Sequence, residues 1–395
     1  MNGRRRTSTR QLFALLAVMT LSACGQQGSE PASSTPTTTA PSSPSPTPSP
    51  SPTPTPAQEL VTWDDNAMVS HLFFHSLVVD PERAFDNDAE APGYLDYMVT
   101  VDEFNEILNQ LYERDYILIS PHDLYEVDAD GGVESIPLEI PEDKKPLVLS
   151  FDDLSYYEYM DDDGFADRLV LNDGKVVNEY TDAAGTQHTG SYDHVPILDA
   201  FVEEHPDFSH DGAKGTIALT GYNGVFGYRT SDLTYDESDT NIEQEQEAAK
   251  EVADELKEHG WEFASHSWGH INFTTSPVSF IQEDHEKWQR EVEPLIGETD
   301  LLVYPFGADI AGVEDYAGAK FEYLKEQGFH AFFHVDASVP AWGQLRPEYL
   351  REARINVDGI SLKNAIDGKS DTLEEFFDPA TVVDPARPES ISGSS

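Results

Sequence analysis

Two short groups of polar residues, each directly after an apolar run, have the residue types of a metal-dependent hydrolase. Asp152 and Asp153 follow the run 147–151, and His266 and His270 follow a second strand-like run. Imidazole nitrogens and carboxylate oxygens bind a divalent transition ion, and a position left open on that ion activates water near neutral pH. The sequence therefore predicts a metallohydrolase.

The two adjacent carboxylates can do different work. At the end of a strand they face different directions, and a carboxylate held by a metal cannot pass protons on, whereas its neighbour can. Adjacent Asp residues are common in a chain with 74 acidic positions, and a His-x-x-x-His pair can lie on one helix face. Here Gly269 and the strand-like run before His266 favour a loop.

Strand-like and helix-like segments alternate along the chain. Strands are predicted at 69–79, 116–119, 147–151, 215–220, 261–265, 301–304 and 329–335. Helices are predicted at 100–111, 195–204, 240–260, 279–296 and 316–327, the first and third opening with capping boxes at Thr100 and Thr240. This alternation predicts an α/β fold in which seven or eight mostly parallel strands close into a barrel, with catalytic groups at their carboxyl ends.

One segment interrupts the alternation. Residues 168–192 contain Asn-Asp-Gly-Lys at 172–175 between two β-rich runs, which predicts a β-hairpin whose turn needs positive φ. We expect this insert near the rim of the site, although a hairpin that only decorates the surface fits the sequence equally well.

The first 57 residues are predicted to lie outside the fold. Residues 1–23 have the basic start and short apolar run of a secretory signal, and Leu-Ser-Ala-Cys-Gly at 21–25 resembles the bacterial lipobox. This predicts lipidation of Cys24, the single cysteine; an ordinary signal with Cys24 unmodified is the alternative. Residues 24–57 are rich in Pro, Ser and Thr and are predicted to form an extended tether at the extracellular face of the cytoplasmic membrane.

Composition limits the partners. The chain has 74 acidic against 24 basic residues and a formal net charge of −50, so nucleic acid is excluded as a partner because phosphates would be repelled. We expect a solvated acidic surface. Residues 58–378 are predicted to form one catalytic domain and 379–395 a disordered tail, while the oligomeric state does not follow from the sequence.

With these motifs the chain resembles the polysaccharide deacetylase family, whose fold is the distorted NodB-like (β/α) barrel. Ser-Phe-Asp-Asp at 150–153 matches the first family motif, with Leu154 where Gly or Asn is usual. His-Ser-Trp-Gly-His at 266–270 matches the second motif in full. The third motif is represented by Val-Tyr-Pro-Phe-Gly at 303–307, in which Val303 stands where many relatives have an Arg.

The resemblance implies roles for these residues. Asp152 would be the general base that takes a proton from the attacking water. Asp153, His266 and His270 would bind a divalent metal, most often Zn²⁺, with Co²⁺ or another first-row ion as alternatives. The backbone N–H of Phe306 is expected to complete an oxyanion site.

Three further residues are candidates for parts of the family machinery. Arg354 is the candidate for the missing third-motif Arg, the alternative being an ordinary ion pair. His75 resembles a His near the site in the biofilm-polysaccharide branch of the family, or is a satisfied core histidine. The acid that protonates the leaving amine has no clear motif, and His334 is another candidate for it.

The sequence thus predicts a lipid-anchored, metal-dependent enzyme that removes N-acetyl groups from the amino sugars of an extracellular polysaccharide, such as cell-wall peptidoglycan. One alternative is a deacetylase-like module that binds glycan without turnover. Another is an O-acetyl esterase using the same metal site. A peptidase is disfavoured because no Glu follows the first His in an H-E-x-x-H arrangement.

Overall fold

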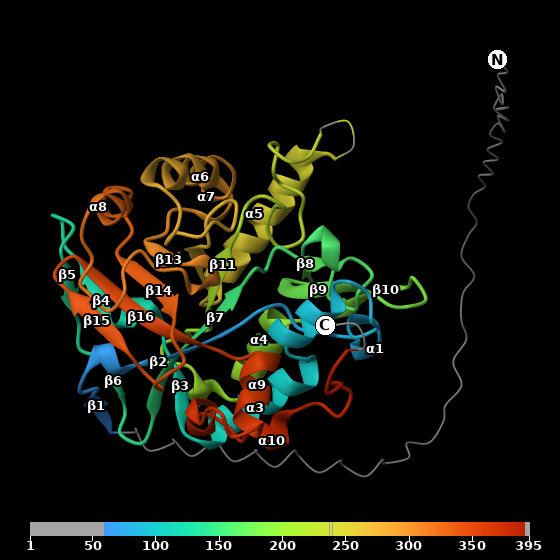
Figure 1. Cartoon of the computed structure of the whole chain (residues 1–395), viewed down its shortest axis with the longest axis horizontal. Helices are drawn as coiled ribbons and strands as arrows, with labels where there is room; N and C mark the ends of the chain where they lie inside the picture. The colour runs from blue at the N-terminus through green and yellow to red at the C-terminus, as the bar shows by residue number, and fades with distance from the viewer. Residues whose placement is uncertain (1–58, 237, 239, 392–395) are drawn as a thin grey trace, which may run out of the picture. The chain divides into compact units, whose positions relative to one another are not determined.

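Seven parallel strands close into a ring at the centre of the molecule (Figure 1). The computed structural model describes residues 59–391 except 237 and 239, so the predicted signal, Cys24 and the whole predicted tether lie outside the described residues. In ring order the strands are β7 (Lys145–Asp152), β11 (Thr216–Leu219), β12 (Glu262–Ser265), β13 (Leu301–Val303), β14 (Ala331–Val335), β16 (Tyr349–Asn356) and β2 (Ser70–Phe74), which pairs again with β7. The predicted α/β barrel is confirmed. It is distorted where β12 and β13 share the single registered pair Ser265 and Leu302.

Ring membership differs from the prediction at two strands. The predicted strand at 116–119 forms β3 (Tyr116–Leu118), which pairs with the first residues of β7 while β11 pairs with the last ones, so β3 is not part of the closed ring. The seventh ring strand is β16, for which no strand was predicted. Its sequence, Tyr-Leu-Arg-Glu-Ala-Arg-Ile-Asn, carries charges on its inward face, and this hides the apolar pattern of a buried strand.

Side chains fill the barrel interior. The apolar part consists of Val69, Val148, Ala218, Ala264, Leu301, Val303, Ala331, Phe333 and Leu350. Further along the strands the inward faces become polar and remain buried, with His71, Ser150, Asp152, Glu352 and Arg354. Because side chains alternate along a strand, Ser150 and Asp152 share the face of Val148 on β7. Toward the carboxyl ends of its strands the barrel therefore has a polar interior, which rests on an apolar one.

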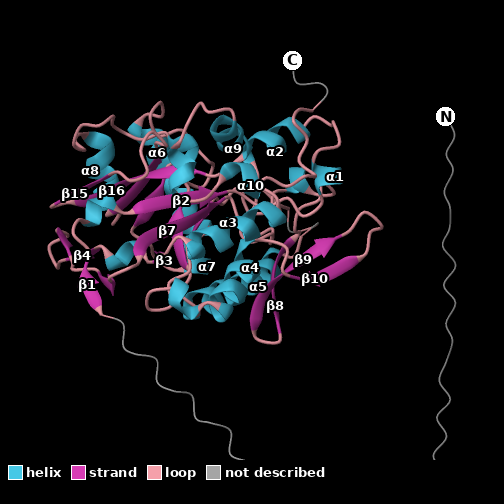
Figure 2. Ribbon diagram, turned by 90° about the horizontal axis from the view of Figure 1, so that it is seen from below, coloured by secondary structure: helices cyan, strands magenta, loops and turns pink. Residues whose placement is uncertain are grey.

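Helices surround the barrel, as Figures 1 and 2 show from two directions. They are α1 (Pro81–Ala84), α2 (Ala91–Tyr97), α3 (Val101–Glu113), α4 (His194–Glu204), α5 (Ile242–Glu258), α6 (Val278–Glu291), α7 (Glu293–Ile296), α8 (Ala319–Glu326), α9 (Gly359–Ile366) and α10 (Pro379–Val382). The capping box predicted at the start of α3 is present, since Glu103 N–H donates to Thr100 Oγ1 and Thr100 N–H donates to Glu103 Oε2.

Three helix predictions needed correction. The N-cap of α5 is Asn241 rather than Thr240, and its side chain accepts a hydrogen bond from Gln244 N–H. The segment predicted as one helix at 279–296 is split into α6 and α7, because Pro294 has no N–H to continue the hydrogen-bond ladder. Helix α8 starts three residues later than predicted.

The insert is a three-stranded antiparallel sheet of β8 (Arg168–Asn172), β9 (Lys175–Thr181) and β10 (Gln187–Gly190). Its first turn is the predicted one, with positive φ at Asp173 (52°) and Gly174 (78°). The sheet projects from one side of the molecule in Figure 2 and packs on α4 and α5. Leu169 N–H donates to Phe226 O in the loop after β11. This hydrogen bond joins strand β8 of the insert to a loop at the rim of the barrel.

Short strands complete the fold. They are β1 (Leu60–Thr62) with β6 (Glu139–Pro141), β4 (Tyr125–Val127) with β5 (Val133–Ser135), and β15 (Gly343–Arg346), which pairs antiparallel with β16. Among the described residues, no helix combines the length and apolar character needed to cross a bilayer.

The prediction of a disordered tail from residue 379 is wrong for residues 379–391. This segment contains α10, and Ile391 is buried. Arg387 donates to Glu103 with both Nε and Nη2, at 2.7 Å each. The tail is ordered because Arg387 neutralises a fully buried carboxylate at the start of α3.

Candidate active site

Three of the predicted site residues form a cluster of metal-ligand type at the carboxyl ends of β7 and β12. One ligand atom each from Asp153, His266 and His270 lies within 4.8 Å of the others. His270 Nε2 is 3.8 Å from Asp153 Oδ2, and His266 Nε2 is 3.8 Å from Asp152 Oδ2. The predicted base is thus next to the predicted ligands.

The backbone of strand β13 orients His266. His266 Nδ1 lies 2.9 Å from Val303 O, and a carbonyl accepts only, so Nδ1 carries the proton and Nε2 presents a lone pair to the cluster. Burial lowers the pKa of His266 to about 4, which keeps the ring neutral at pH 7. Position 303 has Val where the family motif often has Arg, yet the backbone carbonyl of Val303 orients the candidate metal ligand His266.

The backbone of the site is locally strained. Four residues of the sequence motifs have left-handed φ, namely Asp153 (64°), Ser267 (60°), His270 (51°) and Phe306 (61°). Such a conformation costs roughly 1–2 kcal/mol per residue, so the surrounding contacts must impose it. The concentration of these residues around the ligand cluster is typical of a functional site.

Asp284 on α6 holds the His-x-x-x-His loop. Its carboxylate accepts hydrogen bonds from the N–H groups of Trp268 and Gly269, both at 2.8 Å, and its side chain is buried. Sequence reasoning missed Asp284, because nothing in a helix of mixed polarity marks one carboxylate as a loop anchor.

Arg354 forms a bidentate ion pair with Asp152 inside the barrel. Nη1 donates to Oδ1 at 2.6 Å and Nη2 to Oδ2 at 2.9 Å, and both side chains are buried. Burial alone would raise the pKa of Asp152, but the Arg354 guanidinium holds it below its usual range. The structure thus places a guanidinium against Asp152, where the resemblance required one.

A buried polar chain continues behind this ion pair. Arg354 Nη1 also donates to Ser150 Oγ at 3.1 Å, and His71 lies between Ser150 Oγ (2.9 Å) and Glu352 Oε2 (3.1 Å). Burial raises the pKa of Glu352 to about 8, so its carboxyl is protonated at neutral pH. Sequence reasoning missed His71 and Glu352; for Glu352, its spacing of two from the candidate Arg354, which places both on one strand face, was the available signal.

The remaining predicted residues lie at or near the mouth. His75 follows β2, whose last residue Phe74 pairs with Phe151 of β7, so His75 lies beside the strand end that carries Asp152. Phe306 is 69% exposed, and its ring packs edge-on against His270 at 4.4 Å. His334 lies in a neighbouring hollow with Trp342, whose ring is 5.3 Å away.

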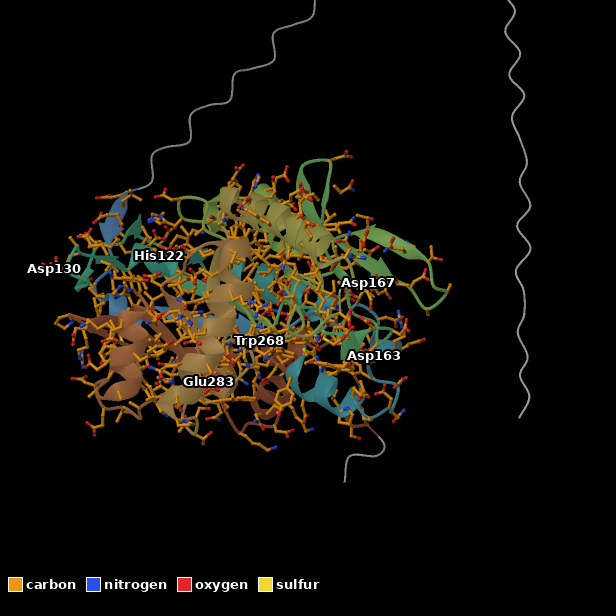
Figure 3. The ribbon with its side chains drawn as sticks, turned by 90° about the horizontal axis from the view of Figure 1, so that it is seen from above. His122, Asp130, Asp163, Asp167, Trp268 and Glu283 are labelled. Carbon is orange, nitrogen blue, oxygen red and sulfur yellow. The ribbon has the colours of Figure 1, made fainter. Side chains whose placement is uncertain are left out.

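Aromatic side chains at a sugar-binding site can stack on sugar rings, and two near the ligand cluster differ in exposure. Tyr304 is fully buried and cannot stack on a sugar. Trp268, labelled in Figure 3, is partly exposed; its Nε1 donates to Glu291 and Lys287 Nζ lies 4.7 Å from its ring centre. Tyr157, which sequence reasoning did not single out, contacts Asp153 directly.

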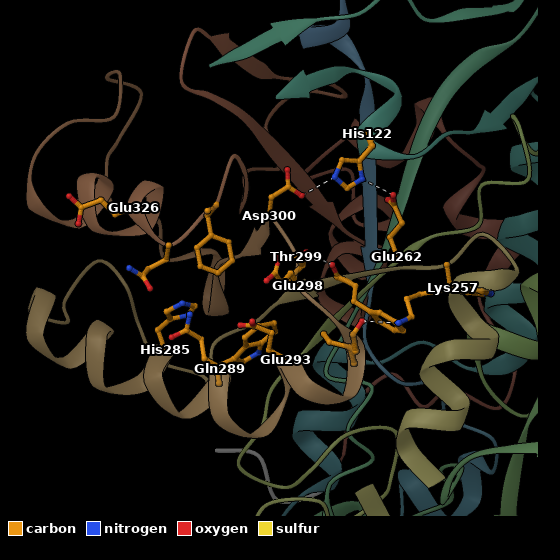
Figure 4. Close-up of a pocket in the computed structure, with 17 residues that line it drawn as sticks. His122, Lys257, Glu262, His285, Gln289, Glu293, Glu298, Thr299, Asp300 and Glu326 are labelled. Carbon is orange, nitrogen blue, oxygen red and sulfur yellow. Dashed lines mark hydrogen bonds and ion pairs between the residues drawn. The ribbon is translucent and has the colours of Figure 1, made fainter. Parts of the chain in front are cut away.

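A cavity of about 600 Å³ lies at the opposite, amino ends of β12 and β13 (Figure 4). At its edge His122 is held between Glu262 Oε1 (2.7 Å) and Asp300 Oδ1 (2.8 Å). Burial opposes protonation of His122, but the two carboxylates raise its pKa to about 10. None of the predicted site residues lines this cavity, and His122 is an ion-pair bridge between barrel strands.

Comparison with known proteins gives a partial match. The family model described as polysaccharide deacetylase matches residues 234–321, which include His266 and His270 but not Asp152 or Asp153. No curated protein matches the chain.

The solved structures that resemble the chain include two deacetylases. The deacetylase PplD of Streptococcus pyogenes, solved with acetate, is 14% identical, with 74% of this chain and 93% of that chain covered and a TM-score of 0.41. A polysaccharide deacetylase from Bacillus cereus is 12% identical, with 76% of this chain and 69% of that chain covered and a TM-score of 0.39. Both scores are below 0.5, so the barrel assignment depends on the strand pairings described above.

The family match falls on the segment that contributes both histidines of the ligand cluster. Over this segment the chain is similar to polysaccharide deacetylases.

Proposed function

We propose that the protein is a metal-dependent deacetylase acting on N-acetylated amino sugars of an extracellular polysaccharide. The observation that supports this most strongly is the ligand cluster of Asp153, His266 and His270 beside a carboxylate that Arg354 pairs in bidentate fashion. Asp153, His266 and His270 can bind an ion, while the neighbouring ionised carboxylate of Asp152 can accept a proton.

The donor set fits zinc or another first-row ion. Two imidazoles and one carboxylate are the ligands of catalytic zinc sites that keep a position for water. When bound, such an ion polarises an acetamide carbonyl and lowers the pKa of water. Co²⁺ accepts the same donors, so the metal is proposed by class.

Asp152 is the proposed general base. Arg354 keeps it ionised, and its Oδ2 faces His266 Nε2 at 3.8 Å, so a water near the ligand cluster is within its reach. Phe306 N–H, in the strained turn after β13, is proposed to donate to the oxygen that becomes negative in the tetrahedral intermediate. His75 is proposed to protonate the leaving amine, because it lies at the mouth beside the strand that carries Asp152.

The substrate and location are proposed from the N-terminal sequence. A lipidated Cys24 and a Pro-rich tether would hold the domain within the cell wall, where peptidoglycan presents N-acetylated sugars. The acidic surface is compatible with a neutral glycan.

Acetate release from N-acetylated chitooligosaccharides and from peptidoglycan, measured with added Zn²⁺ or Co²⁺, tests the proposal. We expect release by the wild type, none by Asp152→Asn with metal still bound, and loss of metal by His266→Ala. Faster release from O-acetyl than from N-acetyl substrates would identify an esterase. Glycan binding without any release would leave a binding module and overturn the proposed activity.

A further inference from the structure

A line of buried hydroxyl groups ends on the metal-ligand candidate Asp153. Tyr157 Oη lies 2.5 Å from Asp153 Oδ1 and 2.7 Å from Thr220 Oγ1. Thr220 Oγ1 in turn lies 3.2 Å from Ser155 Oγ. Tyr157 is 3% exposed, and Ser155 and Thr220 are fully buried, so water does not compete for these contacts.

The direction of the hydrogen bonds follows from the chemistry of the groups. An ionised carboxylate only accepts, so the single hydroxyl proton of Tyr157 points to Asp153. The hydroxyl of Thr220 must then donate to Tyr157 Oη, and that of Ser155 to Thr220 Oγ1. Each bond polarises the next, which strengthens the last one, to Asp153.

The rings of Tyr159 and Tyr222 each stack with that of Tyr157 and hold it in place. The Tyr157 ring is 5.5 Å from that of Tyr159 and 5.2 Å from that of Tyr222, at interplanar angles of 16° and 15°. Because two nearly parallel rings pack against it and the side chain is buried, the hydroxyl of Tyr157 is held against Asp153. The carboxylate therefore has one oxygen fixed before any ion arrives.

We propose that Tyr157 is a positioning residue for the metal ligand Asp153. Its hydroxyl occupies Oδ1, so that Oδ2, which faces His270 Nε2 at 3.8 Å, is the oxygen offered to the ion. This inference rests on the proposed metal site but not on the proposed substrate. In this role Tyr157 orients the Asp153 carboxylate, as hydrogen-bonding partners of metal ligands commonly do.

Metal affinity of the metal-free protein for Zn²⁺ and Co²⁺, measured by calorimetry, is the direct test. For Tyr157→Phe, which removes one oxygen atom, we expect affinity to fall about 10-fold to 100-fold, the usual effect of losing such a partner. The visible spectrum of bound Co²⁺ is expected to change, because Oδ1 becomes free to enter the coordination shell.

Tyr159→Phe is the matched control. The same atom is removed from the adjacent ring of the stack, where the structure gives the hydroxyl no hydrogen bond to Asp153, and we expect affinity within about two-fold of wild type. If Tyr157→Phe does not fold, Thr220→Val tests the same line: it should weaken metal binding, whereas Thr220→Ser, which keeps the hydroxyl, should not.

Equal metal affinity and an unchanged Co²⁺ spectrum in folded Tyr157→Phe would overturn the inference, as would a wild type that binds neither ion. Weakened metal binding in a protein that releases no acetate would uphold the inference and overturn only the proposed substrate chemistry.

Discussion

At the scale of single residues, the site depends on buried charges that are paired inside the barrel. Asp152 is ionised because Arg354 pairs both of its oxygens, and Arg354 is itself fully buried. Leaving either charge alone in the interior would cost several kcal/mol. The further chain through Ser150 and His71 ends at Glu352, whose Oε1 finds no hydrogen-bond partner among the described residues.

Glu352 predicts how stability depends on pH. Its pKa is about 8 when folded and 4.5 in the reference state, so the folded protein holds this proton more tightly. The stabilisation from that proton is complete below pH 4.5 and is lost as pH rises to about 8. The Gln side chain in Glu352→Gln stays neutral at every pH. The free energy of unfolding of this variant, relative to that of the wild type, should therefore rise between pH 4.5 and about 8 and stay constant at higher pH.

Urea unfolding of both proteins between pH 5 and 9 measures this difference. Glu348→Gln is the control, because Glu348 is exposed. A constant difference between Glu352→Gln and the wild type across the range would show that Glu352 is already ionised in the folded protein.

At the scale of elements, the site is assembled by loops that leave parallel strands at one end of the barrel. The apolar runs before Asp152 and His266 predicted two of these strands, and the alternation of helices predicted the barrel. Arg354 was predicted as a site residue only from its residue type and the missing third-motif Arg. The strand that carries it, β16, was not predicted, because two of its inward-facing residues, Glu352 and Arg354, are charged rather than apolar. Contacts such as those of Asp284 and Tyr157 depend on how loops fold back, which no periodicity encodes.

Asp284 provides the test at this scale. It joins α6 to the loop that carries both ligand histidines, accepting two backbone N–H groups. Asp284→Ala leaves both donors without this acceptor, and we expect about a 10-fold loss of metal affinity as the loop loses its shape. Glu283→Gln, on the same helix but exposed and labelled in Figure 3, should bind metal as the wild type does. Unchanged affinity in Asp284→Ala would mean that the strained backbone holds the loop without it.

At the scale of the whole molecule, segments far apart in the sequence close the structure around the barrel. Arg387, near the end of the described chain, donates to both oxygens of Glu103 at the start of α3 and to the carbonyls of Leu95 and Met98. Glu103 is fully buried and also caps α3 through Thr100. The segment predicted as a disordered tail therefore pairs, through Arg387, with Glu103 in the predicted capping box of α3.

Arg387→Ala should accordingly destabilise the protein by about 3–5 kcal/mol, because it leaves the buried Glu103 charge unpaired. Arg290→Ala is the matched control: Arg290 pairs with Asp232 on the surface, where both side chains are about half exposed, and such pairs contribute about 0–1 kcal/mol. Chemical denaturation of the three proteins measures the difference. Adding Glu103→Gln to Arg387→Ala should restore part of the loss, since no unpaired charge then remains. If Arg387→Ala and Arg290→Ala have the same free energy of unfolding, the C-terminal segment does not stabilise α3, which must then be held by its own packing against the barrel.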